Sequence, residues 1–168
     1  ESTTSAPFVG RDQALDTLAR AFDDSRTRPV LVHVRGVSGV GKSTLVARFL
    51  AQHARDAWLC EGRCFEQETV PWKALDAVVD GLVGIVARTS HAERGALLPD
   101  GLGALARMFP SVARITEQTE SGPPDELRAR AVQALSKLIR NLAETKPVVV
   151  YVDDLQWGDE GGVRLLGE

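Results

Sequence analysis

Gly36-Val-Ser-Gly-Val-Gly-Lys-Ser43 is the stretch of sequence that decides the fold. It matches the phosphate-binding pattern G-x-x-x-x-G-K-[ST] without a mismatch. Glycine residues let a backbone take positive φ and curve around an anion, so that successive N–H groups point inward. The stretch therefore predicts a phosphate-binding loop, called the P-loop below.

The segments that flank the P-loop fit this prediction. Residues 29–34, Pro-Val-Leu-Val-His-Val, form a short apolar run that predicts a buried strand. After the loop, Lys42 is expected to begin a helix whose apolar side chains between residues 45 and 50 share one face. The positive end of that helix would strengthen the attraction for an anion.

Two side chains of the P-loop have predicted chemical roles. Lys42 is expected to reach the β- and γ-phosphates of a nucleotide and to act in catalysis, and the Ser43 hydroxyl is expected to ligate Mg²⁺. These roles predict a site for Mg-ATP. The loop residues expected to contact the nucleotide are Gly36, Ser38, Gly39, Val40, Gly41, Lys42 and Ser43.

A second candidate segment is Val148-Val-Val-Tyr-Val-Asp-Asp154. A hydrophobic strand that ends in an acidic residue is typical of the Walker B segment of nucleotide-binding proteins. Asp153 is expected to lie near the Mg²⁺ held by Ser43. Asp154 is expected to act in catalysis, because a carboxylate near the γ-phosphate can orient or deprotonate the attacking water. The alternative for such a pair is a solvated turn, and the intact P-loop in the same chain favours the Walker B interpretation.

Helical and strand patterns alternate along the rest of the chain. Helices are expected from Asp12 onward, from Pro71 to Val86, around residues 102–109 and over residues 125–145. Strands are expected at residues 57–63 and 148–152. Strands separated by helices need crossover connections, which imply a parallel sheet. The fold class is therefore expected to be α/β, the three-layer fold of P-loop nucleoside triphosphatases.

Composition places the chain among globular proteins of about one domain. The 168 residues are 43% hydrophobic and 26% charged. The formal net charge of −3 gives no reason to expect binding to nucleic acid or to an anionic membrane. No apolar run approaches the length of a membrane span. Residues 1–7 are small and polar and are expected to form a flexible leader.

Cys60 and Cys64 are the two cysteines of the chain. Along a strand they would lie about 13 Å apart, whereas a disulfide requires Cα atoms within about 7 Å. The histidines show no ligand spacing near them. Buried thiols in a reducing cytoplasm are therefore expected rather than a disulfide or a metal site.

Three segments together carry a resemblance to a known family. They are Phe8-Val-Gly-Arg11, the P-loop, and Asp153-Asp-Leu-Gln-Trp-Gly-Asp159. Across this span the chain resembles the AAA-like ATPase domains of the STAND class. Such domains occur within large bacterial signalling proteins, including LuxR-type transcriptional regulators and Ser/Thr protein kinases. Residues 61–75 look especially like the members linked to kinases and regulators.

The resemblance implies further contacts with the nucleotide. Val9 and Gly10 would place backbone groups near the adenine base. Arg11 would support that segment or approach a phosphate, and an exposed arginine at a helix start is the alternative. Thr44 would touch the α-phosphate, and Trp157 would pack as a structural residue.

The chain departs from the family pattern after the Walker B segment. In the family, a further strand with a polar sensor residue lies between the P-loop strand and the Walker B strand. The chain ends at Glu168, before that strand, an arginine finger, the helical lid and the winged-helix region. Residues 8–168 are therefore expected to be the N-terminal part of an ATPase domain, truncated after the Walker B strand, with the C-terminal remainder absent. A start at Glu1 rather than Met agrees with a piece of a longer protein.

The expected function is Mg-ATP binding and slow ATP hydrolysis as a nucleotide switch, within a larger cytoplasmic protein for signalling or transcription regulation. The expected partners are ATP or ADP and effector domains of the same polypeptide, without direct binding of nucleic acid or membrane; nucleotide-dependent oligomerisation is left open. One alternative is an origin-recognition-like AAA+ module that grips DNA through a downstream winged helix. The acidic balance and the pair Asp153 and Asp154 favour the switch. A second alternative is an assembly scaffold that binds ATP or ADP and barely hydrolyses it.

Overall fold

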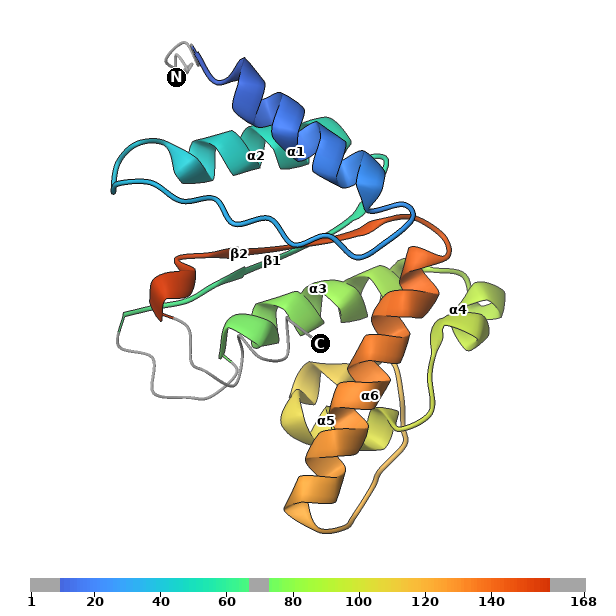
Figure 1. Cartoon of the computed structure of the whole chain (residues 1–168). Helices are drawn as coiled ribbons and strands as arrows, with labels where there is room; N and C mark the ends of the chain where they lie inside the picture. Colours follow the sequence, from blue (N-terminus) through green and yellow to red (C-terminus); the bar gives the residue numbers. More distant parts are fainter. Residues whose placement is uncertain (1–9, 67–72, 158–168) are drawn as a thin grey trace, which may run out of the picture. The chain divides into compact units, whose positions relative to one another are not determined.

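The computed structural model of the chain describes residues 10–66 and 73–157. The chain divides into two compact units, Glu1–Arg55 and Asp56–Glu168. The first unit holds two helices and the P-loop, and the second holds two strands and the remaining helices (Figure 1). The expected leader, Val9 and the expected helix start at Pro71 lie outside the described residues.

The first unit is built on helices α1 (Asp12–Asp24) and α2 (Lys42–His53), and both begin where the sequence predicted. Phe22 of α1 and Phe49 of α2 meet edge to face, with ring centroids 6.1 Å apart. Such aromatic pairs stabilise helix packing beyond the area they bury. The predicted apolar face of α2 is confirmed, since its buried residues are Leu45, Val46, Phe49 and Leu50.

Residues 29–34 do not form the buried strand that the sequence predicted. The backbone there is not paired with another strand, and Leu31 is 72% exposed. An extended segment becomes a strand only when a neighbouring segment satisfies its N–H and C=O groups. Within residues 10–55 the regular elements are the two helices α1 and α2, which offer no such ladder. Local apolar character was therefore not sufficient to make the strand.

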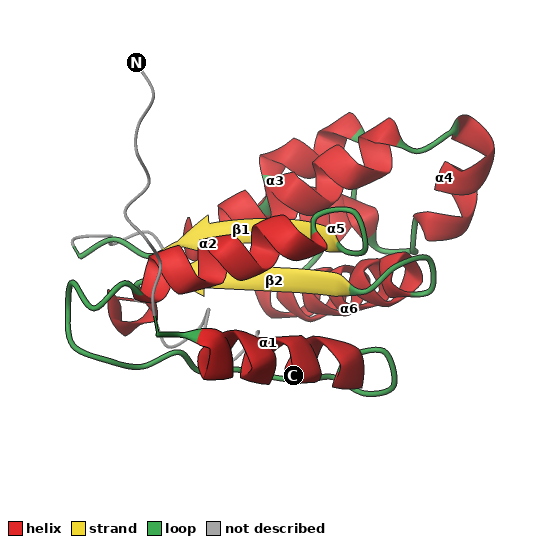
Figure 2. Cartoon of the chain, turned by 90° about the horizontal axis from the view of Figure 1, so that it is seen from above, coloured by secondary structure: helices red, strands yellow, loops and turns green. Residues whose placement is uncertain are grey.

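The second unit contains a parallel pair of strands, β1 (Trp58–Arg63) and β2 (Val148–Asp153). Their register runs from Trp58 opposite Val148 to Arg63 opposite Asp153. Figure 2 shows the two strands lying side by side. Both predicted strands and their parallel direction are thus confirmed. The described sheet has two strands, so the small parallel sheet agrees with an α/β fold, while the three-layer arrangement stays a prediction.

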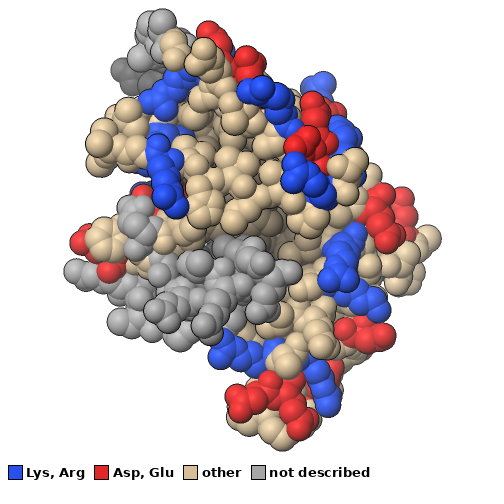
Figure 3. Space-filling view, in the orientation of Figure 1, with Lys and Arg blue, Asp and Glu red and all other residues tan. Residues whose placement is uncertain are grey.

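Helices connect β1 to β2 and supply the crossover that parallel strands require. In order they are α3 (Lys73–Arg88), α4 (His91–Leu97), α5 (Leu102–Met108), the 3-10 helix η1 (Pro110–Arg114) and α6 (Pro124–Ala143). The sequence predicted α3, α5 and α6 close to these bounds. No element of the described residues is a helix long and apolar enough to cross a membrane. On the face that Figure 3 shows, Lys and Arg side chains are interspersed with Asp and Glu side chains.

Helix α4 was not predicted, although its start carries a recognisable signal. The Ser90 hydroxyl accepts a hydrogen bond from the Glu93 N–H at 3.3 Å, and a Glu93 carboxylate oxygen accepts one from the Ser90 N–H at 3.2 Å. This reciprocal pair is a capping box, which satisfies two backbone donors that a helix start leaves open. The pattern Ser-x-x-Glu at residues 90–93 was the missed signal.

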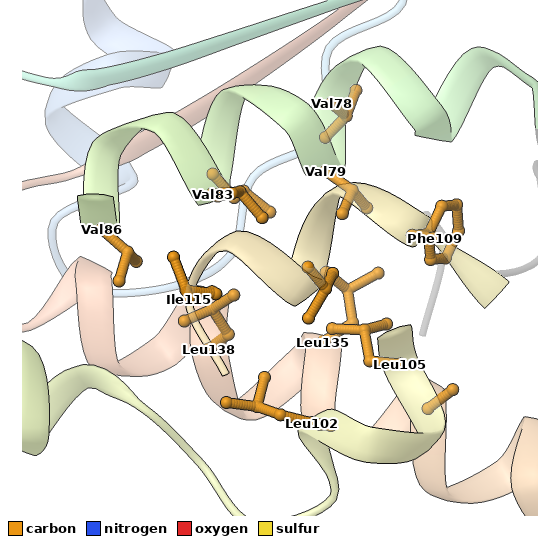
Figure 4. Packing of buried hydrophobic residues seen from close by; sticks show 14 of the residues in the cluster. Val78, Val79, Val83, Val86, Leu102, Leu105, Phe109, Ile115, Leu135 and Leu138 are labelled. Atoms are coloured by element: carbon orange, nitrogen blue, oxygen red, sulfur yellow. The ribbon is translucent and has the colours of Figure 1, made fainter. Parts of the chain in front are cut away.

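The core of the second unit lies between α3 and the helices α5 and α6. Figure 4 shows apolar side chains from these helices, with Ile115 beyond η1, gathered in one interior. The predicted apolar stripe of α3 is confirmed by the burial of its members, Leu75, Val78, Val79, Leu82, Ile85 and Val86. Leu138 and Leu142 of α6 have no exposed surface.

A glycine lets α3 approach β1 closely. A Cβ atom placed on Gly81 would lie 3.2 Å from Cys60 Sγ, tighter than ordinary contacts. Cys60 and Cys64 are both buried, as the sequence predicted. Burial raises the pKa of Cys60 to about 11, and the charge of Arg88 opposes part of that rise.

Candidate phosphate-binding site

The P-loop of the first unit has the backbone conformation that a phosphate cradle needs. Gly39 and Gly41 have φ of 77° and 83°, in the left-handed region that residues with a Cβ adopt at a cost. Gly41 is the N-cap residue of α2, so Lys42 is the first residue of the helix. A left-handed glycine before a helix turns successive N–H groups toward the same concave side. The loop and the positive end of α2 therefore both favour an anion.

Lys42 folds back over the P-loop. Its ammonium donates hydrogen bonds to the carbonyl oxygens of Gly36 at 3.1 Å and Val37 at 3.2 Å. The side chain thus crosses the loop instead of extending into solvent. Neutral carbonyl oxygens bind an ammonium less strongly than phosphate oxygens do. A bound phosphate could therefore replace the two carbonyls as the partner of the Lys42 ammonium.

Ser43 and Thr44 lie in the first turn of α2, and both are exposed. Gly10 also has positive φ, 84°, and is exposed. The structure thus brings the predicted loop residues together within one unit.

Arg11 immediately precedes α1 but is not a freely exposed arginine. It is half-buried, and its guanidinium donates a hydrogen bond to the carbonyl oxygen of Val40 in the P-loop. Arg11 lies at the helix start, as the alternative interpretation also expects, and it has a partner in the P-loop. The contact joins residues that are 29 apart in the sequence, which no local pattern predicted.

Asp153 and Asp154 stand at the carboxyl end of β2 in the second unit. Asp153 is the last residue of the strand, and its carbonyl accepts a hydrogen bond from the Cys64 N–H at 3.0 Å. The Asp154 N–H donates to Asp153 Oδ1 at 3.1 Å. Asp154 has φ of 55°, a left-handed conformation that is uncommon outside glycine. The chain therefore turns sharply at Asp154, directly after the strand.

Asp154 has an ionic partner that sequence reasoning missed. Arg63, the last residue of β1, donates from Nε at 3.1 Å and from Nη2 at 2.8 Å to the same oxygen, Asp154 Oδ2. The Arg63 guanidinium also lies 5.8 Å from the centre of the Phe65 ring. The signal was available: a basic residue ends one predicted strand and an acidic pair ends its parallel partner, so the two ends meet.

Trp157 does not pack as the resemblance implied. It ends the 3-10 helix η2 (Leu155–Trp157), and its side chain is 44% exposed. The backbone N–H of Trp157 donates a hydrogen bond to the Asp154 carbonyl at 3.0 Å, and this bond closes the turn. A single turn that follows the strand leaves the indole at the surface.

Ser43 and Asp153 carry oxygen atoms of the kind that bind Mg²⁺. Among the described residues, no group of three or more His, Cys, Asp or Glu side chains is placed to hold a metal ion. Mg²⁺ is typically bound through one or two carboxylates plus the phosphates of a substrate, rather than by a complete protein cage. The Ser43 hydroxyl of the first unit and the Asp153 carboxylate of the second are each an oxygen ligand that Mg²⁺ can use.

Comparison with known proteins gives the family. The family model described as "AAA ATPase domain" matches residues 7–168. An uncharacterized protein, R02095 of Rhizobium meliloti (strain 1021), is 25% identical over 173 residues, which cover 96% of this chain and 17% of that protein. No solved structure matches the chain. The P-loop at the start of α2, the strand that ends in Asp153 and the match over almost the whole chain lead to one conclusion: the chain belongs to the AAA ATPase domain family.

Proposed function

We propose that the chain binds Mg-ATP through the P-loop and hydrolyses it slowly. One observation carries the proposal: the P-loop curves through left-handed glycines into the start of α2, with the Lys42 ammonium folded over it. This arrangement presents backbone N–H groups, a helix dipole and the positive charge of Lys42 to the same ligand. Membership of the AAA ATPase domain family supports a nucleotide as that ligand.

The P-loop residues have distinct proposed roles. Backbone N–H groups of the loop hold the phosphates, and Lys42 binds the β- and γ-phosphates. Ser43 and Asp153 would each offer an oxygen ligand to Mg²⁺, which would supply positive charge to neutralise the charge that develops on the phosphates. The proposed nucleotide site comprises Gly36, Ser38, Gly39, Val40, Gly41, Lys42, Ser43 and Thr44, together with Val9, Gly10 and Arg11.

Asp154 is the proposed residue that orients the attacking water. Its carboxylate accepts two hydrogen bonds from Arg63 on one oxygen, Oδ2. A carboxylate has a second oxygen and further lone pairs, so one oxygen held by Arg63 leaves acceptor capacity for a water. Arg63 thereby fixes the side-chain direction of the proposed water-binding group.

The biological role that we propose is a nucleotide switch within a larger signalling or transcription-regulating protein. The resemblance carried by the P-loop and by residues 153–159 supports this role. The chain spans 17% of the length of R02095, which supports a module that works beside other domains. Slow hydrolysis prolongs the ATP-bound state, so that neighbouring domains have time to respond to it.

Lys42→Ala tests the binding site. The variant should bind a fluorescent ATP analogue about tenfold more weakly or worse, because a charge-assisted contact is lost. Lys137→Ala is the matched control, since Lys137 is an exposed lysine of α6 in the other unit. Thermal unfolding of both variants checks that the fold is intact. Equal affinity of Lys42→Ala and the wild type would contradict the assignment of the P-loop.

Turnover by the wild type distinguishes the switch from the scaffold. Release of inorganic phosphate from Mg-ATP, followed at saturating nucleotide, should show slow turnover that is lost in Lys42→Ala. Tight binding without any turnover would instead favour the scaffold that holds ATP or ADP structurally.

A further inference from the structure

We propose that Arg11 is a positioning residue of the phosphate site: it fixes the orientation of the peptide between Val40 and Gly41 and so aims the Gly41 N–H at the bound phosphates. The inference rests on the proposed function, because it concerns the same P-loop. It differs from a direct contact with the adenine base, which is what the resemblance implies for the segment that contains Arg11.

The contact that carries this inference joins the residue before α1 to the P-loop. The Arg11 Nη2 group donates to the Val40 carbonyl oxygen, although the two residues are 29 positions apart. A Cβ atom placed on Gly41 would lie 3.8 Å from the same Nη2. The guanidinium therefore lies beside the two residues that precede Lys42. Arg11 itself is held at the start of α1, where its carbonyl accepts a hydrogen bond from the Leu15 N–H at 3.0 Å.

Because the peptide bond is planar, holding the Val40 carbonyl also fixes the direction of the Gly41 N–H. The peptide between Val40 and Gly41 is trans, and in a planar trans peptide the C=O and the N–H point in opposite directions. A carbonyl held toward Arg11 therefore sends the Gly41 N–H to the opposite side. Gly41 has φ of 83° and ψ of 31°, so the next peptide is already committed to the start of α2. The Arg11 guanidinium thus sets the plane of the peptide that joins Val40 to Gly41, the left-handed residue before α2.

The charge of Arg11 makes this hold stronger than an ordinary loop hydrogen bond. Charge-assisted hydrogen bonds are roughly twice as strong as neutral ones. A guanidinium also has five N–H donors in a rigid fork. The Val40 contact uses one group, Nη2. Without Arg11, rotation of this peptide would turn the Gly41 N–H away from the phosphates before nucleotide binds, and affinity would fall.

Arg11→Ala tests the proposal when compared with Arg20→Ala. Arg20 is an exposed arginine of α1, and its guanidinium donates to the Asp16 carbonyl and the Thr17 hydroxyl of the same helix. Two ligands are titrated with Mg²⁺ by displacement of a fluorescent ATP analogue: ATP and inorganic tripolyphosphate. We expect Arg11→Ala to weaken both by a similar factor, about tenfold, the scale of one charge-assisted hydrogen bond. Arg20→Ala should bind both as the wild type does.

Two comparisons separate positioning from other roles of Arg11. A direct contact with the base would weaken ATP but leave tripolyphosphate unchanged, and that result would overturn the proposal. Simple attraction between Arg11 and the phosphates would make the loss disappear at about 1 M salt, where charges are screened beyond about 3 Å. We expect the loss to persist there, because the lost contact is a hydrogen bond within the loop.

Hydrogen exchange on the nucleotide-free protein gives a test that does not depend on binding. The amides of residues 39–42 should exchange faster in Arg11→Ala than in the wild type and in Arg20→Ala. Equal exchange would overturn the proposal even if nucleotide binding were confirmed. Failure of the wild type to bind either ligand would instead refute the proposed function, and the exchange result would still show whether Arg11 holds the loop.

Discussion

Replacing Gly39 with alanine isolates the contribution of the P-loop backbone to nucleotide binding. Gly39 has φ of 77°, and a Cβ atom added there would meet no heavy atom within 4 Å. The substitution therefore introduces no collision and removes no side chain. Its one physical effect is to make the left-handed conformation unfavourable for that residue.

The size of the effect follows from this conformational penalty. A residue with a Cβ pays about 1–2 kcal/mol in the left-handed region. If nucleotide requires the loop to keep this conformation, the penalty appears as lost affinity. Since about 1.4 kcal/mol is a factor of ten, affinity should fall roughly 5- to 30-fold. Titration with a fluorescent ATP analogue in the presence of Mg²⁺ measures the change.

Gly101→Ala is the matched control for backbone strain. Gly101 has φ of 85° at the start of α5, and an added Cβ would make ordinary contacts, 3.5 Å from Ala134 Cβ and 3.6 Å from the Arg130 carbonyl. Its variant should lose stability to urea by a similar free energy, about 1–2 kcal/mol, while ATP affinity stays at the wild-type value. Wild-type affinity in Gly39→Ala, or an equal loss of affinity in Gly101→Ala, would refute the reasoning.

Three further outcomes are expected. Asp154→Asn should slow phosphate release from ATP and spare ATP affinity, because an amide cannot take a proton from water as a carboxylate can; unchanged turnover would count against its proposed role. Leu138→Ala should lower the free energy of unfolding in urea by about 2–5 kcal/mol, because Leu138 is 0% exposed and truncation leaves a cavity. Burial raises the pKa of Cys60 from 9.0 to about 11, so the folded protein disfavours the thiolate. Its contribution to stability is complete below pH 9 and is lost as the pH rises through about 11. The alkaline fall of stability should therefore be shallower in Cys60→Ala than in the wild type, and equal slopes would contradict this.

The sequence determined those features whose causes are local. The start of α2 at Lys42 follows from the glycines before it and from the apolar spacing after it. The sequence predicted both β1 and β2 within one residue at each end, and in β2 a run of β-branched valines accounts for the strand. Helical spacing in the same way predicted the buried stripe of α3.

The tertiary structure alone decided the features that depend on residues distant in the chain. Residues 29–34 have the composition of a buried strand, yet a strand needs a paired neighbour and composition does not supply one. Arg63 meets Asp154 because parallel pairing brings the ends of β1 and β2 together. Arg11 reaches Val40 because α1 places it beside the P-loop. The motif by itself indicated a loop with left-handed glycines, since that conformation depends on local sterics. The partners that hold its backbone and the proposed catalytic carboxylate became visible only in the fold, because hydrogen bonds between distant residues leave no periodic trace in the sequence.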